Sequence, residues 1–202
     1  MKVLNADFVT SAARADGIPR DDLPHFAMAG RSNVGKSSLI NALCRARIAR
    51  TSAAPGKTRL ANFYRVLVEG GPGGPGVWGL YLVDLPGYGY ARGGAEAAGE
   101  LARVAADYFK GSPATAGVLL LVDARHPGLQ ADLDAASWLA RTKAAVTLAA
   151  TKVDKLSRNE RNRNLKALET VFGMPALPIS AASGEGMDEL WRTIARLVRP
   201  GV

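Results

Sequence analysis

Short apolar runs alternate along this chain with stretches in which apolar residues recur every three or four positions. The runs predict buried strands and the wider spacing predicts helices. Six strands are predicted, at residues 25–29, 63–68, 77–83, 118–122, 146–150 and 176–179. Helices are predicted directly after the first strand, around residues 101–109, at 129–139, around 165–172 and at 190–198.

Strands that are apolar throughout and alternate with helices predict a mostly parallel sheet covered by helices on both faces. Strands 63–68 and 77–83 are joined by a short loop rich in glycine and proline, so we expect an antiparallel hairpin there. The predicted fold is an α/β domain of three layers, with a mostly parallel six-stranded sheet and one antiparallel edge strand. Residues 1–24 are expected to be an extension packed on one domain, residues 25–202.

A phosphate-binding loop is predicted between the first strand and the first helix. The sequence there fits G-x-x-x-x-G-K-S, in which glycines let backbone N–H groups turn toward phosphate oxygens and the helix N-terminus adds partial positive charge. Lys36 is expected to reach the β- and γ-phosphates, and the Ser37 hydroxyl to ligate Mg²⁺. The expected phosphate contacts are Gly30, Arg31, Ser32, Asn33, Val34, Gly35, Lys36 and Ser37.

The segment Asp84-Leu85-Pro86-Gly87 follows a predicted strand, at the sheet edge where such proteins bind ligands. Asp84 is placed like the acidic residue that holds Mg²⁺ in P-loop hydrolases. Gly87 has no Cβ, so its N–H can approach a γ-phosphate closely. The sequence therefore predicts that Lys36 and Gly87 are catalytic residues that contact the γ-phosphate.

Guanine recognition is predicted from Thr151-Lys152-Val153-Asp154, which follows the strand 146–150. An ionised aspartate only accepts hydrogen bonds, so Asp154 suits the two donors at N1 and N2 of guanine and rejects adenine, whose N1 is an acceptor. Lys152 can lay its aliphatic stem along the base. After the last strand, Ser180, Ala181 and Ala182 are expected to place backbone N–H groups near the guanine carbonyl. Ile179, Ser180 and Ala181 belong to the expected contact set. The expected ligand is GTP or GDP.

Composition limits the class of protein. With 48% hydrophobic and 22% charged residues the chain is globular, and no signal sequence or apolar run suited to a bilayer is visible. We therefore expect a cytoplasmic protein with no membrane partner. The net charge of +8 suits a polyanion such as RNA or simply a solvated surface. The same alternatives hold for Arg192, Arg196 and Arg199, which share one face of the last predicted helix.

The motifs GRSNVGKSSLINAL, PGKTRLANFY, DLPGYGYA, DARHPG and TKVDKL together resemble the EngB family of bacterial ribosome-biogenesis GTPases. The resemblance implies a role in assembling the large ribosomal subunit. We expect the subunit and its RNA as partners, no DNA and a monomeric protein. The resemblance also implies that Thr58 is the switch threonine that joins Mg²⁺ and GTP, although the residues alone do not choose it over Thr51 and Ser52. Its neighbours in the expected contact set are Gly56, Lys57, Arg59 and Leu60.

Two residues leave the mechanism open. Tyr88 stands where Ras-like proteins place the glutamine that orients the attacking water, and a tyrosine lacks that amide, so we expect slow turnover without a partner. Asn33 resembles the asparagine of GTPases assisted by K⁺, or it holds its own loop backbone. Two functions follow: a GTP hydrolase that times release from pre-ribosomes, or a nucleotide-gated binding module in cell-division or septation control.

Overall fold

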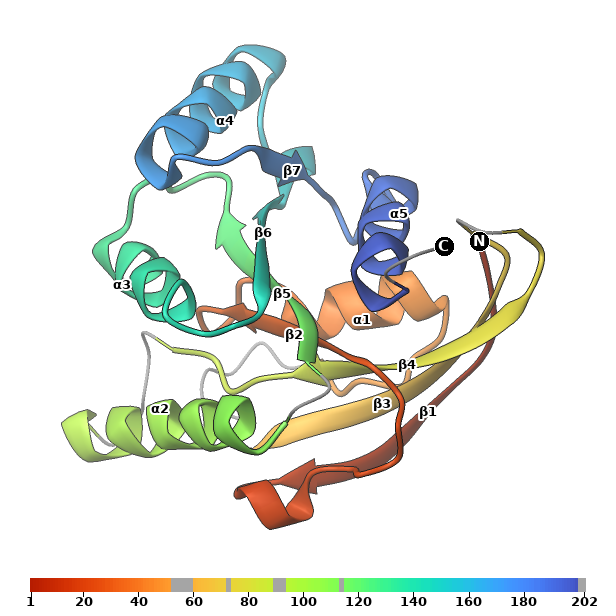
Figure 1. Ribbon diagram of the computed structural model, residues 1–202. Coiled ribbons are helices and arrows are strands. Elements are labelled where there is room, and N and C mark those ends of the chain that lie inside the picture. The colour runs from red at the N-terminus through yellow and green to blue at the C-terminus, as the bar shows by residue number, and fades with distance from the viewer. Residues whose placement is uncertain (52–59, 72–73, 89–93, 113–114, 200–202) are drawn as a thin grey trace.

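The computed structural model describes residues 1–51, 60–71, 74–88, 94–112 and 115–199 (Figure 1). Its strands are β1 (Lys2–Ala12), β2 (His25–Gly30), β3 (Ala61–Glu69), β4 (Val77–Asp84), β5 (Thr115–Asp123), β6 (Ala145–Thr151) and β7 (Ala176–Pro178). Its α-helices are α1 (Lys36–Cys44), α2 (Gly94–Gly111), α3 (Gln130–Leu139), α4 (Arg158–Phe172) and α5 (Met187–Val198). Single 3-10 turns lie at Ala15–Gly17 and Val153–Lys155.

The strands form one sheet in the order β1-β3-β4-β2-β5-β6-β7. The strands from β4 to β7 in this order pair in parallel, whereas β3 is antiparallel to both β4 and β1. The α/β class, the mostly parallel sheet and its antiparallel edge are confirmed. The strand count is corrected from six to seven, because the N-terminal segment adds β1 outside β3.

Strand β1 was not predicted, because it contains no continuous run of buried apolar residues. Most of its residues are exposed or half-buried, as expected at a sheet edge. Its pairing with β3 places Lys2 opposite Glu69 and Asp7 opposite Arg65. Opposite charges across neighbouring strands favour that register.

The side chains of each central strand alternate between two cores. On one face, Ala27 of β2 packs in the core covered by α2, α3 and α4, to which Tyr108 and Leu168 contribute. On the other face, Phe26 packs in the core covered by α1 and α5, with Leu43 and Trp191. Figure 1 shows these layers, with α1 and α5 on the opposite side of the sheet from α2 and α3.

The parallel strands share one carboxyl edge, and the loops after β2, β4, β6 and β7 meet there (Figure 1). Proteins with such sheets bind ligands at that edge. Among the helices that the structure describes, none combines the length and apolar sequence needed to cross a bilayer.

Candidate nucleotide-binding site

The loop between β2 and α1 has the geometry of an anion cradle. Gly35 caps α1 with a φ of 113°, a left-handed conformation that glycine adopts without a steric cost. Val34 is buried and anchors the loop to the core. The first backbone N–H groups of α1 have no partner within the helix, so they suit the oxygens of a phosphate.

Lys36 is held inside this cradle. Its side chain is buried, and Nζ donates to the carbonyl oxygens of Gly30 at 3.1 Å and Arg31 at 3.4 Å. Burial lowers the pKa of Lys36, while the nearby Asp84 carboxylate opposes that shift. The ammonium group is therefore positioned by backbone dipoles beside the expected phosphates.

Ser37 and Asp84 meet from α1 and β4. The Ser37 hydroxyl donates to Asp84 Oδ2 at 2.7 Å, and Asp84 is 1% exposed. Burial raises the pKa of Asp84, against the opposing effects of Lys36 and Ser37. Asp84 Oδ1 is buried and has no hydrogen-bond partner within the part of the chain that the structure describes.

A buried carboxylate oxygen without a partner costs free energy, which a bound cation would offset. Mg²⁺ prefers hard oxygen ligands such as a hydroxyl and a carboxylate, so Ser37 and Asp84 fit a magnesium site. Mg²⁺ bound beside them would neutralise negative charge on the phosphates of a nucleotide.

Gly87 touches the phosphate loop. A Cβ on Gly87 would lie 2.9 Å from Ser32 N and 3.0 Å from Lys36 Nζ, so any side chain would displace the loop or its lysine. The Ser32 N–H also donates to the Tyr88 carbonyl at 3.0 Å. The turn after β4 and the phosphate loop are thus in direct contact.

Tyr88 points away from this contact toward α3. Its hydroxyl donates to Asp132 Oδ1 at 2.9 Å, and Arg31 Nε forms an ion pair with the same oxygen at 3.2 Å. Asp132 is 1% exposed. Burial raises the pKa of Tyr88 far above its usual value, and Asp132 adds to the shift. Asp132 could not be identified from a local pattern, because its partners lie far away along the chain.

A cavity of ≈ 360 Å³ lies beside the phosphate loop, within the size range of small-ligand sites. The start of α1 and the loops after β6 and β7 form its walls. It brings together residues predicted to bind nucleotide and others that were missed, namely Ser38, Leu39 and Lys155. The predicted residues among its lining are Val34, Gly35, Thr151, Lys152, Asp154, Ile179, Ala181 and Ala182.

Asp154 lines this cavity as an oriented carboxylate. Its Oδ1 accepts a hydrogen bond from the buried Ser180 hydroxyl at 2.7 Å, and Lys155 Nζ lies 3.3 Å from Oδ2. The hydrogen bond from Ser180 lowers the pKa of Asp154, and Lys155 adds to this effect. Asp154 is therefore ionised at neutral pH and acts as an acceptor.

The loop after β7 differs in detail from the prediction. The N–H of Ser180 donates to the Glu185 carbonyl at 3.0 Å, and the N–H of Ala182 donates to Ser180 Oγ at 3.2 Å. These donors are occupied because the loop folds back on the serine hydroxyl. The N–H of Ala181, which lines the cavity, has no hydrogen bond to any described residue, so it can serve a ligand.

Lys152 and Thr151 connect this cavity to the phosphate loop. Lys152 Nζ donates to the Asn33 carbonyl at 2.8 Å and to Asp123 Oδ2 at 3.0 Å. The Thr151 hydroxyl lies 3.0 Å from the carbonyl oxygen of Val34. These contacts fix the end of β6 against the loop, a positioning role that the sequence analysis did not foresee.

Asp123 is a further residue that the sequence analysis left without a role. Arg125 Nη2 lies 2.7 Å from its Oδ2, the oxygen that also holds Lys152. Burial acts to raise the pKa of Asp123, but the hydrogen bonds from Arg125 and Lys152 together hold it well below its usual value. Its position directly after an apolar strand was the available signal.

Several predicted contact residues do not face the cavity. Leu85 and Val153 are each 1% exposed and belong to the apolar core, and Pro86 is buried. Leu60 is exposed just before β3. The remaining predicted residues lie outside the described part of the chain: Gly56, Lys57, Thr58 and Arg59.

The chain is similar in sequence to known GTP-binding proteins. Residues 25–152 match the family model described as 50S ribosome-binding GTPase. The probable GTP-binding protein EngB of Pelotomaculum thermopropionicum is 42% identical over 204 residues, covering 98% of each chain.

Two solved structures share the fold. One, of a probable GTP-binding protein EngB, has a TM-score of 0.61 at 20% identity and covers 87% of this chain and 98% of that one. The other, of Era with MgGDPNP and nucleotides 1506–1542 of 16S ribosomal RNA, has a TM-score of 0.71 at 22% identity. It covers 89% of this chain and 58% of the Era chain.

The structural similarity supports the P-loop GTPase fold, and the sequence identity over nearly the full length establishes the family. The site agrees with both, since it combines a phosphate loop, a hydroxyl–carboxylate pair and an oriented aspartate at one sheet edge. The protein is a GTPase, and the chain belongs to the EngB family of GTP-binding proteins.

Proposed function

We propose that this cytoplasmic protein hydrolyses GTP slowly to GDP and phosphate and acts as a nucleotide-gated assembly factor for the large ribosomal subunit. The observation that carries the nucleotide assignment is the carboxylate of Asp154, held by buried Ser180 beside a ≈ 360 Å³ cavity. The assignment to the large subunit is supported by the matching family model, which is described as 50S ribosome-binding GTPase.

In this proposal the cavity holds guanine. The ionised Asp154 accepts hydrogen bonds from N1 and N2, the Ala181 N–H donates to the guanine carbonyl, and Lys152 lies along the base. The backbone of residues 30–37 binds the phosphates together with Lys36. Ser37 ligates Mg²⁺, and Thr58 joins it when GTP is bound, as the resemblance to EngB implies.

Slow hydrolysis is supported by the position of Tyr88. Its side chain lacks an amide to orient water, and its hydroxyl is already bonded to Asp132. Lys36 can stabilise charge that develops on the phosphates, but the attacking water needs a further group. A ribosomal partner, or K⁺ near Asn33, supplies that group in this proposal.

The arginines of α5 are the proposed contact with ribosomal RNA. Arg192 lies 2.7 Å and Arg196 3.8 Å from oxygens of Glu189, and the Arg199 guanidinium lies 5.7 Å from the Trp78 ring centroid. Exposed ion pairs contribute little stability, so RNA phosphates can replace Glu189 as the partner. The pairing lowers the net charge of these three arginines from +3 to +2, because one carboxylate serves two of them.

Co-sedimentation with purified ribosomal subunits tests the proposal. The protein should co-sediment with the large subunit when loaded with a non-hydrolysable GTP analogue, and much less with GDP. The small subunit serves as the control partner. Equal binding with both nucleotides, or equal binding to both subunits, would contradict nucleotide-gated assembly.

A nucleotide-specificity variant sharpens the experiment. Asp154→Asn replaces one acceptor oxygen with a donor and should favour xanthine over guanine nucleotides. Its binding to the large subunit should then respond to a xanthosine triphosphate analogue and not to the guanosine one. Gating that still follows the guanosine analogue in this variant would show that the site of Asp154 does not control docking.

A further inference from the structure

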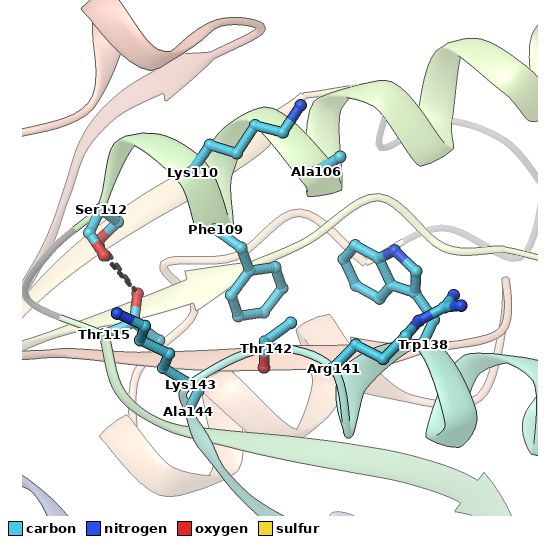
Figure 2. A pocket seen from close by; sticks show the side chains of 10 residues that line it. All are labelled: Ala106, Phe109, Lys110, Ser112, Thr115, Trp138, Arg141, Thr142, Lys143 and Ala144. Carbon is cyan, nitrogen blue, oxygen red and sulfur yellow. Dashed lines mark hydrogen bonds between the residues drawn. The ribbon is translucent and has the colours of Figure 1, made fainter.

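A second cavity, of ≈ 550 Å³, lies at the other end of the sheet (Figure 2). It is bounded by the end of α2, the end of α3 with the turn that follows it, and the start of β5. Strand β5 reaches the nucleotide edge at Asp123 and this cavity at Thr115, so about 25 Å of extended chain separates the two sites. Its volume is within the range of small-ligand sites.

Two aromatic rings form one wall of this cavity. Phe109 of α2 and Trp138 of α3 lie edge to face, with ring centroids 5.4 Å apart and planes at 71° (Figure 2). Both side chains remain half-exposed although they pack on the core. Such a wall offers apolar contact to a planar ring, as aromatic residues do in single-stranded nucleic-acid sites.

Three exposed cations surround the aromatic wall: Lys110, Arg141 and Lys143. Within the described part of the chain, none of them pairs with a carboxylate, and no acidic residue lines the cavity. Positive charge gathered around a cavity without a counter-charge favours an anionic ligand. This contrasts with α5, where Glu189 already partners two arginines.

The hydroxyl groups of the cavity are committed to the protein. Ser112 Oγ lies 2.8 Å from His25 Nδ1, and Thr115 Oγ1 lies 3.1 Å from Ser112 Oγ (Figure 2). The Thr142 hydroxyl donates to the Leu139 carbonyl at 2.7 Å. Recognition therefore depends on the cations and the aromatic wall, which select a ligand with both a negative charge and a flat ring.

We propose that this cavity binds a nucleoside monophosphate unit, with its base against Phe109 and Trp138 and its phosphate attracted by the positive charge of Lys110, Arg141 and Lys143. That unit comes either from a free nucleotide or from an unpaired nucleotide of an RNA chain. The site shares no residue with the guanine nucleotide cavity, so the inference goes beyond the proposed GTPase function.

The test uses the full-length protein with its GTP site filled by excess GDP. Adenosine and uridine monophosphate, a short oligouridine and inorganic phosphate are titrated separately while tryptophan fluorescence and heat of binding are followed. The base-containing ligands should quench fluorescence and bind more tightly than phosphate. In Trp138→Phe the quenching should disappear, which assigns the signal to this cavity and not to the other tryptophans.

Matched variants test the lining residues. Lys110→Ala/Lys143→Ala should weaken nucleotide binding by about tenfold or more, whereas Arg158→Ala/Lys166→Ala removes the same charge from the exposed face of α4 and should change it by less than about twofold. Trp138→Ala should weaken binding by about fivefold or more, the scale of one stacked base. GDP affinity should stay unchanged in all of them, which separates failure here from failure of the GTPase assignment.

Comparing the titrations with different ligands also identifies the source of the nucleotide. Oligouridine that binds more tightly than the monophosphates, with a strong salt dependence, indicates RNA. Monophosphates that bind as tightly as oligouridine indicate a free nucleotide. The proposal is overturned if none of these ligands binds at millimolar concentration or if inorganic phosphate binds as tightly as the nucleotides. Unchanged affinity in Lys110→Ala/Lys143→Ala would overturn it as well.

Discussion

The carboxylate of Asp154 offers the sharpest test of base recognition. Ser180 donates to its Oδ1 at 2.7 Å and Lys155 lies 3.3 Å from its Oδ2, so the side chain is oriented while its other lone pairs face the cavity. In Asp154→Asn the amide carbonyl can still accept from Ser180. The amide nitrogen then presents N–H groups where guanine also presents donors.

The size of the effect follows from the hydrogen bonds that are lost. Each bond from a guanine N–H to the ionised carboxylate contributes about 1.5–3 kcal/mol, and one of the two becomes a donor–donor contact. We expect Asp154→Asn to weaken GDP binding by about 2–4 kcal/mol, which is about a thirtyfold to thousandfold rise in Kd. Xanthine carries a carbonyl in place of the guanine amino group, so xanthosine diphosphate should bind the variant better than GDP does.

Calorimetric titration of parent and variant with both diphosphates measures this directly. Ser180→Ala is the matched control, because it removes the group that orients the carboxylate but leaves the acceptor in place. It should weaken GDP binding without turning the preference toward xanthosine diphosphate. If Asp154→Asn binds GDP as tightly as the parent, or shows no gain for xanthosine diphosphate, guanine is not read by this residue.

Three further predictions concern other groups. Ser37→Ala should lose most of the Mg²⁺ dependence of nucleotide binding, and titrations with and without Mg²⁺ that match the parent would contradict the ligand role. Tyr88→Phe should leave basal GTP hydrolysis within about twofold of the parent. It should lower the free energy of unfolding by about 1–3 kcal/mol, because buried Asp132 loses a hydrogen-bond donor. A large fall in hydrolysis would assign a catalytic role to the Tyr88 hydroxyl. Burial lowers the pKa of His25 from 6.5 to about 4, so the unfolded chain takes up a proton that the folded chain refuses. Stability is then complete above pH 6.5 and falls by about 3 kcal/mol toward pH 4; urea unfolding should show this fall in the parent and a smaller one in His25→Gln.

The parts of the site that the sequence predicted are those that lie within a few residues of one another. The phosphate loop and Asp154 each follow a strand, so local pattern and fold class together placed them at one edge. The pairs that orient them join distant residues, such as Ser180 with Asp154 and Lys152 with the Asn33 carbonyl. Such pairs depend on how strands stack in the sheet, which no local pattern contains.

Helix α5 shows a different limit. Its periodicity placed Arg192 and Arg196 on one face, but the sequence analysis overlooked Glu189, three residues before Arg192. That spacing places side chains side by side on a helix, so the pairing was within reach of sequence reasoning. Strand β1 was beyond it, because an exposed edge strand has no apolar pattern to mark it.

The contact between Tyr88 and Asp132 bears on how hydrolysis is activated. Asp132 is buried and its Oδ1 lies close to both the Tyr88 hydroxyl and Arg31 Nε, so it joins the turn after β4, the phosphate loop and α3. Moving Tyr88 toward the phosphates would leave that carboxylate without its hydrogen-bond donor, at a cost of about 1–3 kcal/mol. The move would also gain little, since a phenol cannot replace an amide that both donates to and accepts from water. Under the proposed function, activation therefore needs a group other than Tyr88, and rearrangement of Tyr88 alone does not supply it.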